Sequence, residues 1–305
     1  MSTTAAYQKV FPFALLLCSF LANAQTPRPL PAPYGPEAKV NYVRTWEAVT
    51  PIIDASSLHT ATSVDKARMT TQYIDGLGRP IQLTVKQGSL ATGGSATDLV
   101  SPVEYDAFGR EAFKYLPFAS AESNGLLKLN PFQQQQSFMQ AQYGGQGETF
   151  FYSQTQFESS PLSRVEKAMA PGNSWSGSNK GVEQKYWINT APDVVRIWNV
   201  TDASNAFGSY TSSGNYLAGE LYKNVAIDEH QKQVIEFKDK EGKLILKKVQ
   251  LTAAPDNGSG SNHAGWLCTY YIYDDLNQLR AVIQPRGVEL LETNGWNMNA
   301  LNGDI

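Results

Sequence analysis

A short turn-forming unit recurs along this chain and constrains its fold more than any other feature. The unit begins with an aromatic or apolar residue close to an aspartate, and it ends with a glycine or asparagine followed by a basic or polar residue. Copies occur at 73–79, 105–110, 237–243 and 273–278, with a weaker copy at 227–232. Recurrence of one supersecondary unit indicates an array of β-hairpins and not an active site.

Each position of the unit has a physical role in a hairpin turn. An aspartate at the first turn position can accept a hydrogen bond from the backbone two residues on, and glycine or asparagine at the fourth can take the left-handed conformation. A type I turn followed by such a residue is a common hairpin loop. We therefore predict structural turns held by the following residues: Asp75, Gly78, Arg79, Asp106, Gly109, Arg110, Asp239, Gly242, Asp274 and Asn277.

The segments that flank the units have the character of strands. Residues 80–86 alternate in polarity after the first unit, and residues 234–237 and 279–284 are rich in β-branched and apolar residues. We expect the aromatic residue of each unit to pack on the sheet face. These aromatics are Tyr73, Tyr105, Phe237 and Tyr273.

The recurring aspartates have two other interpretations. A calcium loop needs carboxylates at alternate positions and a closing glutamate, and the segment 75–79 lacks them. Paired catalytic carboxylates would need a cleft shared by distant aspartates. The turn interpretation is favoured because the glycine and the basic residue recur together with the aspartate.

Composition fits a globular, strand-rich protein. The chain has 305 residues, enough for one large or two ordinary domains, and it contains 15 tyrosines, 6 tryptophans and 13 phenylalanines. A net charge of −3 gives no electrostatic case for nucleic acid or for an acidic membrane surface as a partner.

The N-terminus has the pattern of a secretory signal peptide. An apolar stretch at 10–21 is too short for a stable transmembrane helix, and Ala22-Asn-Ala24 fits the small-x-small cleavage site. We expect a signal peptide over 1–24, cleavage before Gln25, and export to the periplasm, the cell surface or the medium without a transmembrane helix in the mature chain. Lipidation at Cys18 is disfavoured, because Leu17 stands where a small residue is expected.

Cleavage would leave Cys268 as the one cysteine, so that no intrachain disulfide could form. Cys268 lies in an apolar, strand-like run and is expected to be a buried thiol. A catalytic thiol would need a histidine close in space, and the nearest in sequence, His263, belongs to a Gly/Ser/Asn loop. The nucleophile interpretation is therefore disfavoured.

The chain is organised as a leader followed by many short strands. A Pro-rich extended leader is expected over 25–36, and a β-rich domain over 37–305 that divides into sub-units near 37–218 and 219–305. Strands are expected at 41–49 and 149–157. Residues 184–189 and 193–200 are expected to pair with each other.

One short surface helix is predicted near 131–141. Asn130 suits the cap, Pro131 the first helical position, and Gly144-Gly145 the end. The fold class is therefore mainly β, an antiparallel β-hairpin array or meander with this one helix.

No motif for catalysis, for a metal or for another cofactor is found. The histidines, His59, His230 and His263, are scattered and interpreted as surface residues. Loops are expected at 170–179 and 210–214, and their aromatics Trp175 and Tyr210 either bind glycans or a partner, or pack under the loops as core residues. The core interpretation is favoured.

Several of these segments together resemble the exported Rhs/YD-repeat proteins of bacteria, and in particular the uncharacterised domain before their repeat region. The resemblance extends over roughly 40–290. It is carried by the segments 73–82, 103–117, 234–243 and 265–276, and also by 158–165 and 170–172.

The resemblance implies a role that the residues alone do not. In Rhs-type proteins the repeats build a spiralling β-sheet shell around a C-terminal toxin or other cargo, which an aspartyl self-cleavage releases. This chain departs from that pattern, because its units are irregularly spaced and neither a shell-closing core nor a toxin follows them. We therefore expect an exported, non-enzymatic structural module with an Rhs-like sheet at the N-terminal end of such a shell. Its partner would be the remainder of a larger chain or its cargo. The alternative is a cell-surface carbohydrate- or protein-binding β domain.

Overall fold

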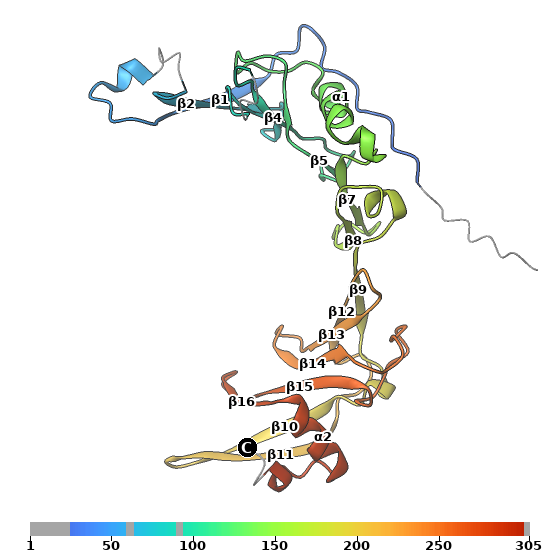
Figure 1. Cartoon of the computed structure of the whole chain (residues 1–305). Coiled ribbons are helices and arrows are strands. Elements are labelled where there is room, and N and C mark those ends of the chain that lie inside the picture. Colours follow the sequence, from blue (N-terminus) through green and yellow to red (C-terminus); the bar gives the residue numbers. More distant parts are fainter. Residues whose placement is uncertain (1–24, 59–63, 90–93, 302–305) are drawn as a thin grey trace, which may run out of the picture.

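The computed structural model describes residues 25–58, 64–89 and 94–301. Over these residues the chain is mainly β, and nearly all its strands belong to antiparallel sheets with hairpin or meander connections, which confirms the expected fold class (Figure 1). The expected signal peptide, 1–24, lies outside the described residues.

Two larger sheets follow one another along the chain. The first has the strand order β1-β2-β3-β4-β6 and comes from the N-terminal third. Its strands are β1 (Asn41–Ala48), β2 (Ala67–Ile74), β3 (Pro80–Val85), β4 (Leu99–Pro102) and β6 (Phe118–Ala119).

The second sheet has nine strands in the order β16-β15-β14-β13-β12-β9-β8-β7-β5. Its strands are β5 (Phe113–Tyr115), β7 (Tyr152–Phe157), β8 (Val165–Met169), β9 (Val182–Ile188), β12 (Tyr222–Ile227), β13 (Gln233–Lys238), β14 (Leu244–Gln250), β15 (Trp266–Tyr273) and β16 (Leu279–Ile283). The β9–β12 ladder crosses the boundary expected near residue 218, so the sheet is continuous there. The division into sub-units stays a prediction.

A third, two-stranded sheet corrects two expectations. It consists of β10 (Arg196–Ala203) and β11 (Ala206–Asn215). The predicted pairing of 184–189 with 193–200 is wrong, since β9 pairs with β8 and β12 while β10 pairs with β11. The loop expected at 210–214 is part of β11. Its serine- and glycine-rich sequence has low strand propensity, and pairing with β10 overrides that preference.

The second turn unit connects two sheets and does not close a full hairpin. β4 stays in the first sheet and β5 joins the second, and a single bridge between Val103 and Lys114 spans the base of the turn. The chain therefore passes from one sheet to the other at the turn that contains Asp106.

The predicted helix is present as α1 (Pro131–Tyr143), with Pro131 in its first turn. Asn130 stands at the N-cap position but makes no side-chain capping bond, so the expected cap is wrong. The α-helix ends at Tyr143 with Gly144 as its C-cap, which confirms the expected end, and a 3-10 turn follows. One face of α1 is buried, because Phe132 and Met139 pack against the sheets. Packing thus compensates for the missing cap.

A second helix, α2 (Pro285–Thr293), was not expected. It too begins with a proline in its first turn, and its buried residues Val288 and Leu291 are spaced three apart. Both belong to the core over β15. The 3-10 helices are η1 (Ala55–Leu58), η2 (Gly144–Gln146), η3 (Ser176–Ser178), η4 (Ala191–Asp193) and η5 (Met298–Leu301). Among the described residues, no helix is long and apolar enough to cross a membrane.

The Pro-rich leader is extended and lies along both large sheets. The backbone N–H of Gln25 donates to the carbonyl of Gly177 (2.9 Å), and that of Tyr34 donates to Leu129 (2.7 Å). Arg28 forms a two-pronged ion pair with Glu104 (2.5 and 2.8 Å). Its guanidinium also lies over the ring of Phe113 at 4.1 Å.

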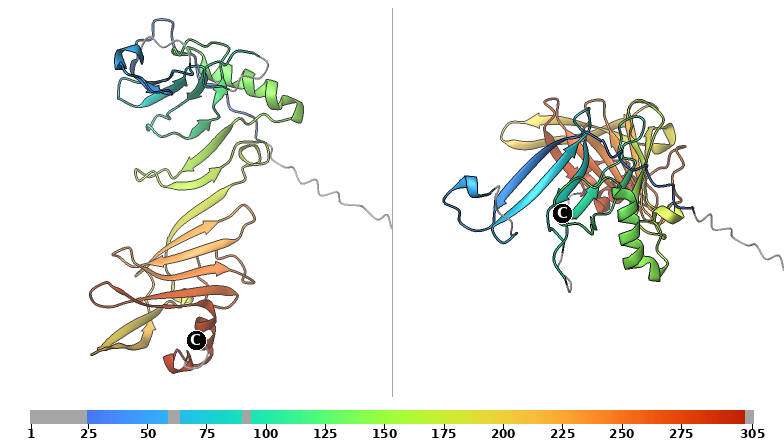
Figure 2. Two further views of the ribbon diagram at one scale, coloured as in Figure 1. Left: turned by 60° about the vertical axis from the view of Figure 1, so that its left-hand side comes forward. Right: turned by 90° about the horizontal axis from the view of Figure 1, so that it is seen from above.

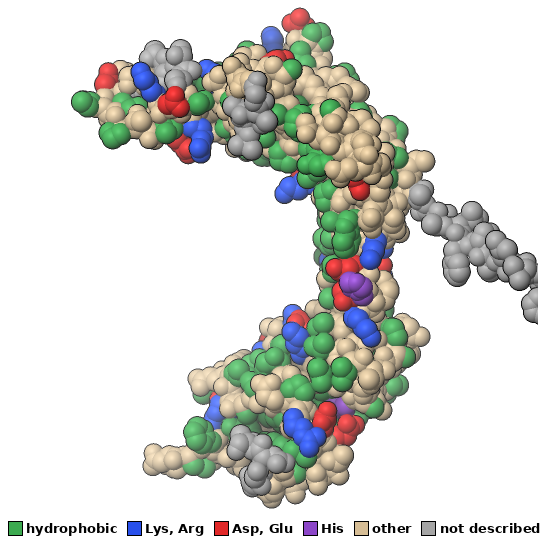
Figure 3. All heavy atoms as spheres, in the orientation of Figure 1, with side chains coloured by type: hydrophobic (Ala, Val, Ile, Leu, Met, Phe, Trp, Pro, Cys, Tyr) green, Lys and Arg blue, Asp and Glu red, His purple; other side chains and the backbone are tan. Residues whose placement is uncertain are grey.

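The sheets follow a curved path, and the molecule is elongated (Figure 2). In the space-filling view the side enclosed by the curve is hollowed between the first sheet and the C-terminal half, with apolar side chains along parts of its rim (Figure 3). The largest core cluster lies in the C-terminal half and includes Phe237, Leu246, Tyr270, Ile272 and Leu291. Two smaller clusters lie under α1.

Candidate functional site

The recurrent turn units adopt one shared geometry. At the first unit the N–H of Asp75 donates to the carbonyl of Arg79 (2.9 Å), and the N–H of Gly78 donates back to the carbonyl of Asp75 (3.1 Å). The side-chain Oδ1 of Asp75 accepts from the backbone N–H groups of Leu77 and Arg79, both at 2.9 Å. One carboxylate therefore satisfies two turn donors and fixes the loop.

The other copies repeat this pattern. The Oδ1 atoms of Asp106, Asp228, Asp239 and Asp274 each accept from the backbone two and four residues on, at 2.8–3.1 Å. The fourth position has a positive φ in every copy. These residues are Gly78, Gly109, Gln231, Gly242 and Asn277. The copy at 227–232, which matches the sequence pattern least well, therefore has the same backbone conformation as the others.

These hydrogen bonds lower the pKa values of four of the aspartates. At Asp75 the backbone N–H of Arg79 is the largest cause. The corresponding bonds, from Lys232 and Gln278, are the largest causes at Asp228 and Asp274. At Asp106 desolvation acts in the opposite direction and is outweighed by the bonds from Arg110. The turn therefore favours the ionised carboxylate.

In three of the units the basic residue at the end makes an ion pair within its own turn. Arg79, Arg110 and Lys243 contact the carboxylates four residues earlier at 2.8, 2.8 and 3.2 Å. In the last copy the fifth turn position is Gln278, and Arg280 contacts Asp274 instead, at 3.1 Å. These side chains remain partly exposed, so each pair contributes little by itself.

The same basic residues also connect each turn to the next unit. The guanidinium of Arg79 lies 4.4 Å from the ring centroid of Tyr105, and that of Arg110 lies 4.7 Å from Phe157. The ammonium of Lys243 lies 5.8 Å from Tyr273. Neighbouring turns are therefore held together by cation–π contacts as well as by the sheet.

Residues 158–164 form a longer turn of the same kind, which the aspartate pattern in the sequence does not mark. Glu158 replaces the aspartate, Ser163 has a positive φ of 50°, and Arg164 pairs with Glu158 at 2.8 Å. Arg164 also lies over Tyr186 at 4.4 Å. The sequence pattern that marks this turn is an acidic residue, Glu158, a basic residue six positions later, Arg164, and a turn-forming serine between them, Ser163.

We call these five segments the stacked turns: 75–79, 106–110, 158–164, 239–243 and 274–278. Four of them carry a large apolar side chain at the position before the positive-φ residue. These side chains, Leu77, Phe108, Leu162 and Leu276, are 71–80% exposed. The apolar turn tips contribute nothing to the core.

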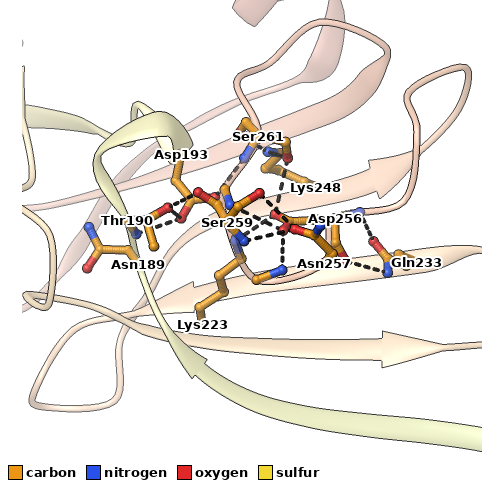
Figure 4. A network of polar contacts seen from close by, with 12 residues as sticks. Asn189, Thr190, Asp193, Lys223, Gln233, Lys248, Asp256, Asn257, Ser259 and Ser261 are labelled. Atoms are coloured by element: carbon orange, nitrogen blue, oxygen red, sulfur yellow. Dashed lines mark hydrogen bonds and ion pairs between the residues drawn. The ribbon is translucent and has the colours of Figure 1, made fainter.

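A buried lysine centre, which was not predicted, lies between β9, β12 and the loop after β14 (Figure 4). The Nζ of Lys223 contacts Asp193 Oδ1 at 2.8 Å and Asp256 Oδ2 at 2.6 Å, and all three side chains are fully buried. Asp256 Oδ1 accepts from the N–H groups of Gly258 (2.8 Å) and Gly260 (3.3 Å). Desolvation raises the pKa of Asp256, but the bonds from Lys223 and these N–H groups outweigh it and lower the pKa overall.

A second buried lysine lies beside this centre. The Nζ of Lys248 donates to the carbonyl (2.7 Å) and hydroxyl (2.8 Å) of Ser261, and lies 4.8 Å from the ring of Trp266. Burial lowers its pKa to about 8. No described carboxylate is paired with it.

A comparable buried contact occurs near the first sheet. Lys128 Nζ contacts Asp98 Oδ2 at 2.8 Å, Asn124 Oδ1 at 2.8 Å and Glu122 Oε2 at 3.0 Å. The carboxylate of Glu122 is half exposed. This centre is therefore open to water on one side.

Cys268 and His263 do not form a nucleophilic pair. Cys268 is a buried free thiol, as expected, and burial raises its pKa to about 12. His263 is also buried, which corrects its interpretation as a surface residue, and its Nε2 lies 2.8 Å from the hydroxyl of Tyr270. Burial lowers the pKa of His263 to about 4, so the ring is neutral near pH 7.

The two aromatics considered as ligand contacts differ in their surroundings. Trp175 and Tyr143 line an open depression of about 280 Å³ near the start of β7. Tyr210 is a strand residue that packs on the main core, and its hydroxyl donates to the carbonyl of Arg280 (3.3 Å). Within the described ranges, no cluster of histidine, cysteine and acidic side chains could hold a metal ion.

Comparison with known proteins gives limited matches. Residues 44–188, just under half of the chain, match a family model described as a domain of unknown function, DUF6443. The matched region runs from β1 to the end of β9. It includes the stacked turns 75–79, 106–110 and 158–164.

Among solved structures, one titled "Crystal Structure of TcdB2-TccC3" matches with a TM-score of 0.41 and 15% sequence identity. The match covers 75% of this chain, which spans about a tenth (10%) of the length of that chain. No curated protein matches the chain.

Proposed function

We propose that this chain is an exported, non-enzymatic structural module at the N-terminal end of an Rhs/YD-repeat-type β-sheet shell. The observation that supports the proposal best is the set of stacked turns. Each basic residue pairs with an acid in its own turn, and Arg79, Arg110 and Lys243 also lie over an aromatic ring of a neighbouring unit. Through such contacts each hairpin helps to position the next one. This arrangement suits a β-sheet shell that is extended by successive hairpins.

The position of β16 supports a continuing sheet. β16 is an edge strand and, among the described residues, β15 is its sheet neighbour. Leu279 and Val282 on β16 are exposed. An edge of this kind has unpaired backbone groups that accept a further strand. We propose that a hairpin of the larger chain pairs with β16.

The coding sequence after residue 305 and hydrogen exchange test this proposal together. We expect further Tyr-Asp turn units downstream of Ile305. The amides on the free side of β16 should exchange quickly in this chain alone and become protected in a product that contains the next units. Absence of such units, or unchanged exchange in the longer product, would contradict the proposal.

A second candidate function is binding of a carbohydrate or protein at the cell surface. Its support is the open depression lined by Trp175, Tyr143 and Pro171, since exposed aromatic surfaces suit such ligands. A glycan array tests it. Saturable binding that is lost in Trp175→Ala but kept in Phe207→Ala, an exposed aromatic outside this depression, would favour this candidate.

A further inference from the structure

The lysine centre around Lys223 combines three features that are chemically unusual together. A lysine amine contacts two aspartate carboxylates, and none of the three side chains is exposed to solvent. The Trp187 and Phe237 rings lie 5.7 and 5.6 Å from the same Nζ. Burial of this many charges is costly, and their mutual attraction often does no more than offset the desolvation.

We propose that Lys223 and Asp256 condense to form an intrachain isopeptide bond, with Asp193 as the proton carrier. The product would be a neutral amide in place of a buried ion pair. Neutralisation removes the cost of holding both charges away from water.

The reaction balances without any further reagent. The Nζ of Lys223 attacks the side-chain carboxyl carbon of Asp256, a C–N bond forms, and the bond from that carbon to Oδ2 breaks. Oδ2 leaves as water with two of the three ammonium protons, and the third stays on the amide nitrogen. No electrons are transferred to or from another molecule.

The local geometry assigns Asp256 as the acyl partner. Its Oδ2 has the shorter contact with Nζ, 2.6 Å against 2.8 Å for Asp193 Oδ1. Its Oδ1 accepts from the N–H groups of Gly258 and Gly260, which are placed to stabilise negative charge on that oxygen during the attack. The Ser261 hydroxyl donates to the leaving Oδ2 at 3.3 Å.

Asp193 is positioned to move the protons. Its Oδ1 contacts Nζ, while its Oδ2 is held by the N–H (2.8 Å) and hydroxyl (3.0 Å) of Thr190. A carboxylate fixed in this way can take a proton from the attacking amine and return it to the leaving oxygen. Because the centre is buried, water for the reverse hydrolysis is excluded.

The bond would connect β12 to the loop that follows β14. That loop contains the run Asn257–Asn262, which is rich in glycine and serine and is otherwise held by hydrogen bonds. A covalent link between residues 223 and 256 restricts the unfolded chain as a disulfide does. The described residues contain one cysteine, Cys268, so they cannot form an intrachain disulfide.

Mass spectrometry of the full chain under denaturing conditions tests the proposal. We expect a mass lower than that of the unmodified sequence by one water molecule. Digestion should release a branched peptide that joins the segments containing Lys223 and Asp256. An unmodified mass for the wild-type protein would overturn the proposal, as would a branched peptide that maps to Lys128 instead.

Variants then assign the roles. Lys223→Met and Asp256→Ala should each have the full mass calculated from its own sequence, with no loss of water. The same is expected of Asp193→Asn, which keeps the size of the side chain but removes the proton acceptor. Lys248→Met is the matched control, because Lys248 is equally buried but contacts no carboxylate, and it should keep the water deficit. A deficit that persists in Asp256→Ala or Asp193→Asn would overturn the roles given to these residues.

Discussion

At the residue scale, the backbone conformation of the fourth turn position decides which side chains it tolerates. Gly78 and Gly109 have φ values of 82° and 77°, where a β-carbon is strained. At Gly109 an added β-carbon would also lie 3.0 Å from Nη1 of Arg79, whereas at Gly78 no atom lies within 4 Å. A substitution at Gly78 would therefore introduce backbone strain alone, whereas a substitution at Gly109 would add side-chain crowding to that strain.

Replacement of two glycines in one turn isolates the conformational effect. Gly78→Ala should lower the free energy of unfolding by about 1 kcal/mol, because alanine must take a left-handed conformation. Gly76→Ala in the same turn should change it by less than about 0.5 kcal/mol, since its φ is not in the strained region and no atom lies within 4 Å. Urea denaturation measures both, and equal effects would contradict the assigned turn geometry.

The pH dependence of stability can be tested at a single residue, Glu158. Hydrogen bonds from the Arg164 side chain are the largest cause that lowers the pKa of Glu158 from 4.5 to about 2. A lowered folded-state pKa means that this stabilisation is complete above the unfolded-state pKa and is lost as the pH falls from 4.5 toward about 2. In Glu158→Gln the urea midpoint should fall less over this range than in the wild type. Parallel pH profiles for the two proteins would contradict the expected contribution.

At the scale of elements, the stacked turns connect units that sheet hydrogen bonds alone do not connect. The first and second turns are a clear case, because β2 and β3 belong to the first sheet while the chain after Arg110 enters the second. Arg79 on Tyr105 is a side-chain contact across this junction. We infer that such contacts fix the relative position of successive hairpins.

A double-mutant cycle tests the contact between these two turns. Arg79→Met and Tyr105→Leu should show a coupling free energy of about 0.5–1 kcal/mol, the range of partly exposed cation–π contacts. The exposed pair Arg286–Glu289 on α2 is the control and should couple by less than about 0.5 kcal/mol. A coupling at Arg79–Tyr105 no larger than that of the control would show that the stacking does not contribute.

At the scale of the whole molecule, the leader contacts both large sheets, as α1 does. The hydroxyl of Tyr34 lies 3.5 Å from the carbonyl of Ile81 in β3, and the N–H of Arg28 donates to the hydroxyl of Tyr152 in β7 (3.3 Å). The ion pair of Arg28 with Glu104 adds a charged anchor near the junction. The leader thus bridges the sheets from outside.

Removal of this anchor should loosen the leader without unfolding the sheets. In Arg28→Ala the backbone amides of residues 25–38 should exchange faster, and the thermal midpoint should decrease by a few degrees, because an ion pair and a cation–π contact of about 1–2 kcal/mol are lost. Arg286→Ala, a substitution of a largely exposed arginine, should leave both quantities unchanged. Unchanged exchange in Arg28→Ala would contradict the bridging role.

The local structure of this protein is encoded in short segments of its sequence. The aspartate, the glycine or asparagine and the alternating flanks act within a few residues of one another, so the turns and most strands could be predicted from spacing alone. α1 was predictable for the same reason, since Asn130 and Pro131 at its start and Gly144 at its end are together a local signal. The fold class followed from the recurrence of one local unit.

The pairing of strands and the contacts between buried charges depend instead on tertiary packing. β9 could pair with β10 or with β12 on local grounds, and the partner was settled by burial of Val225 and Phe237 in the C-terminal core. Asp193, Lys223 and Asp256 are about 30 residues apart in sequence, with separations of 30 and 33 positions, and no local pattern marks them. Their contact depends on how distant strands are ordered in the sheet, because burial and charge pairing are properties of the packed molecule.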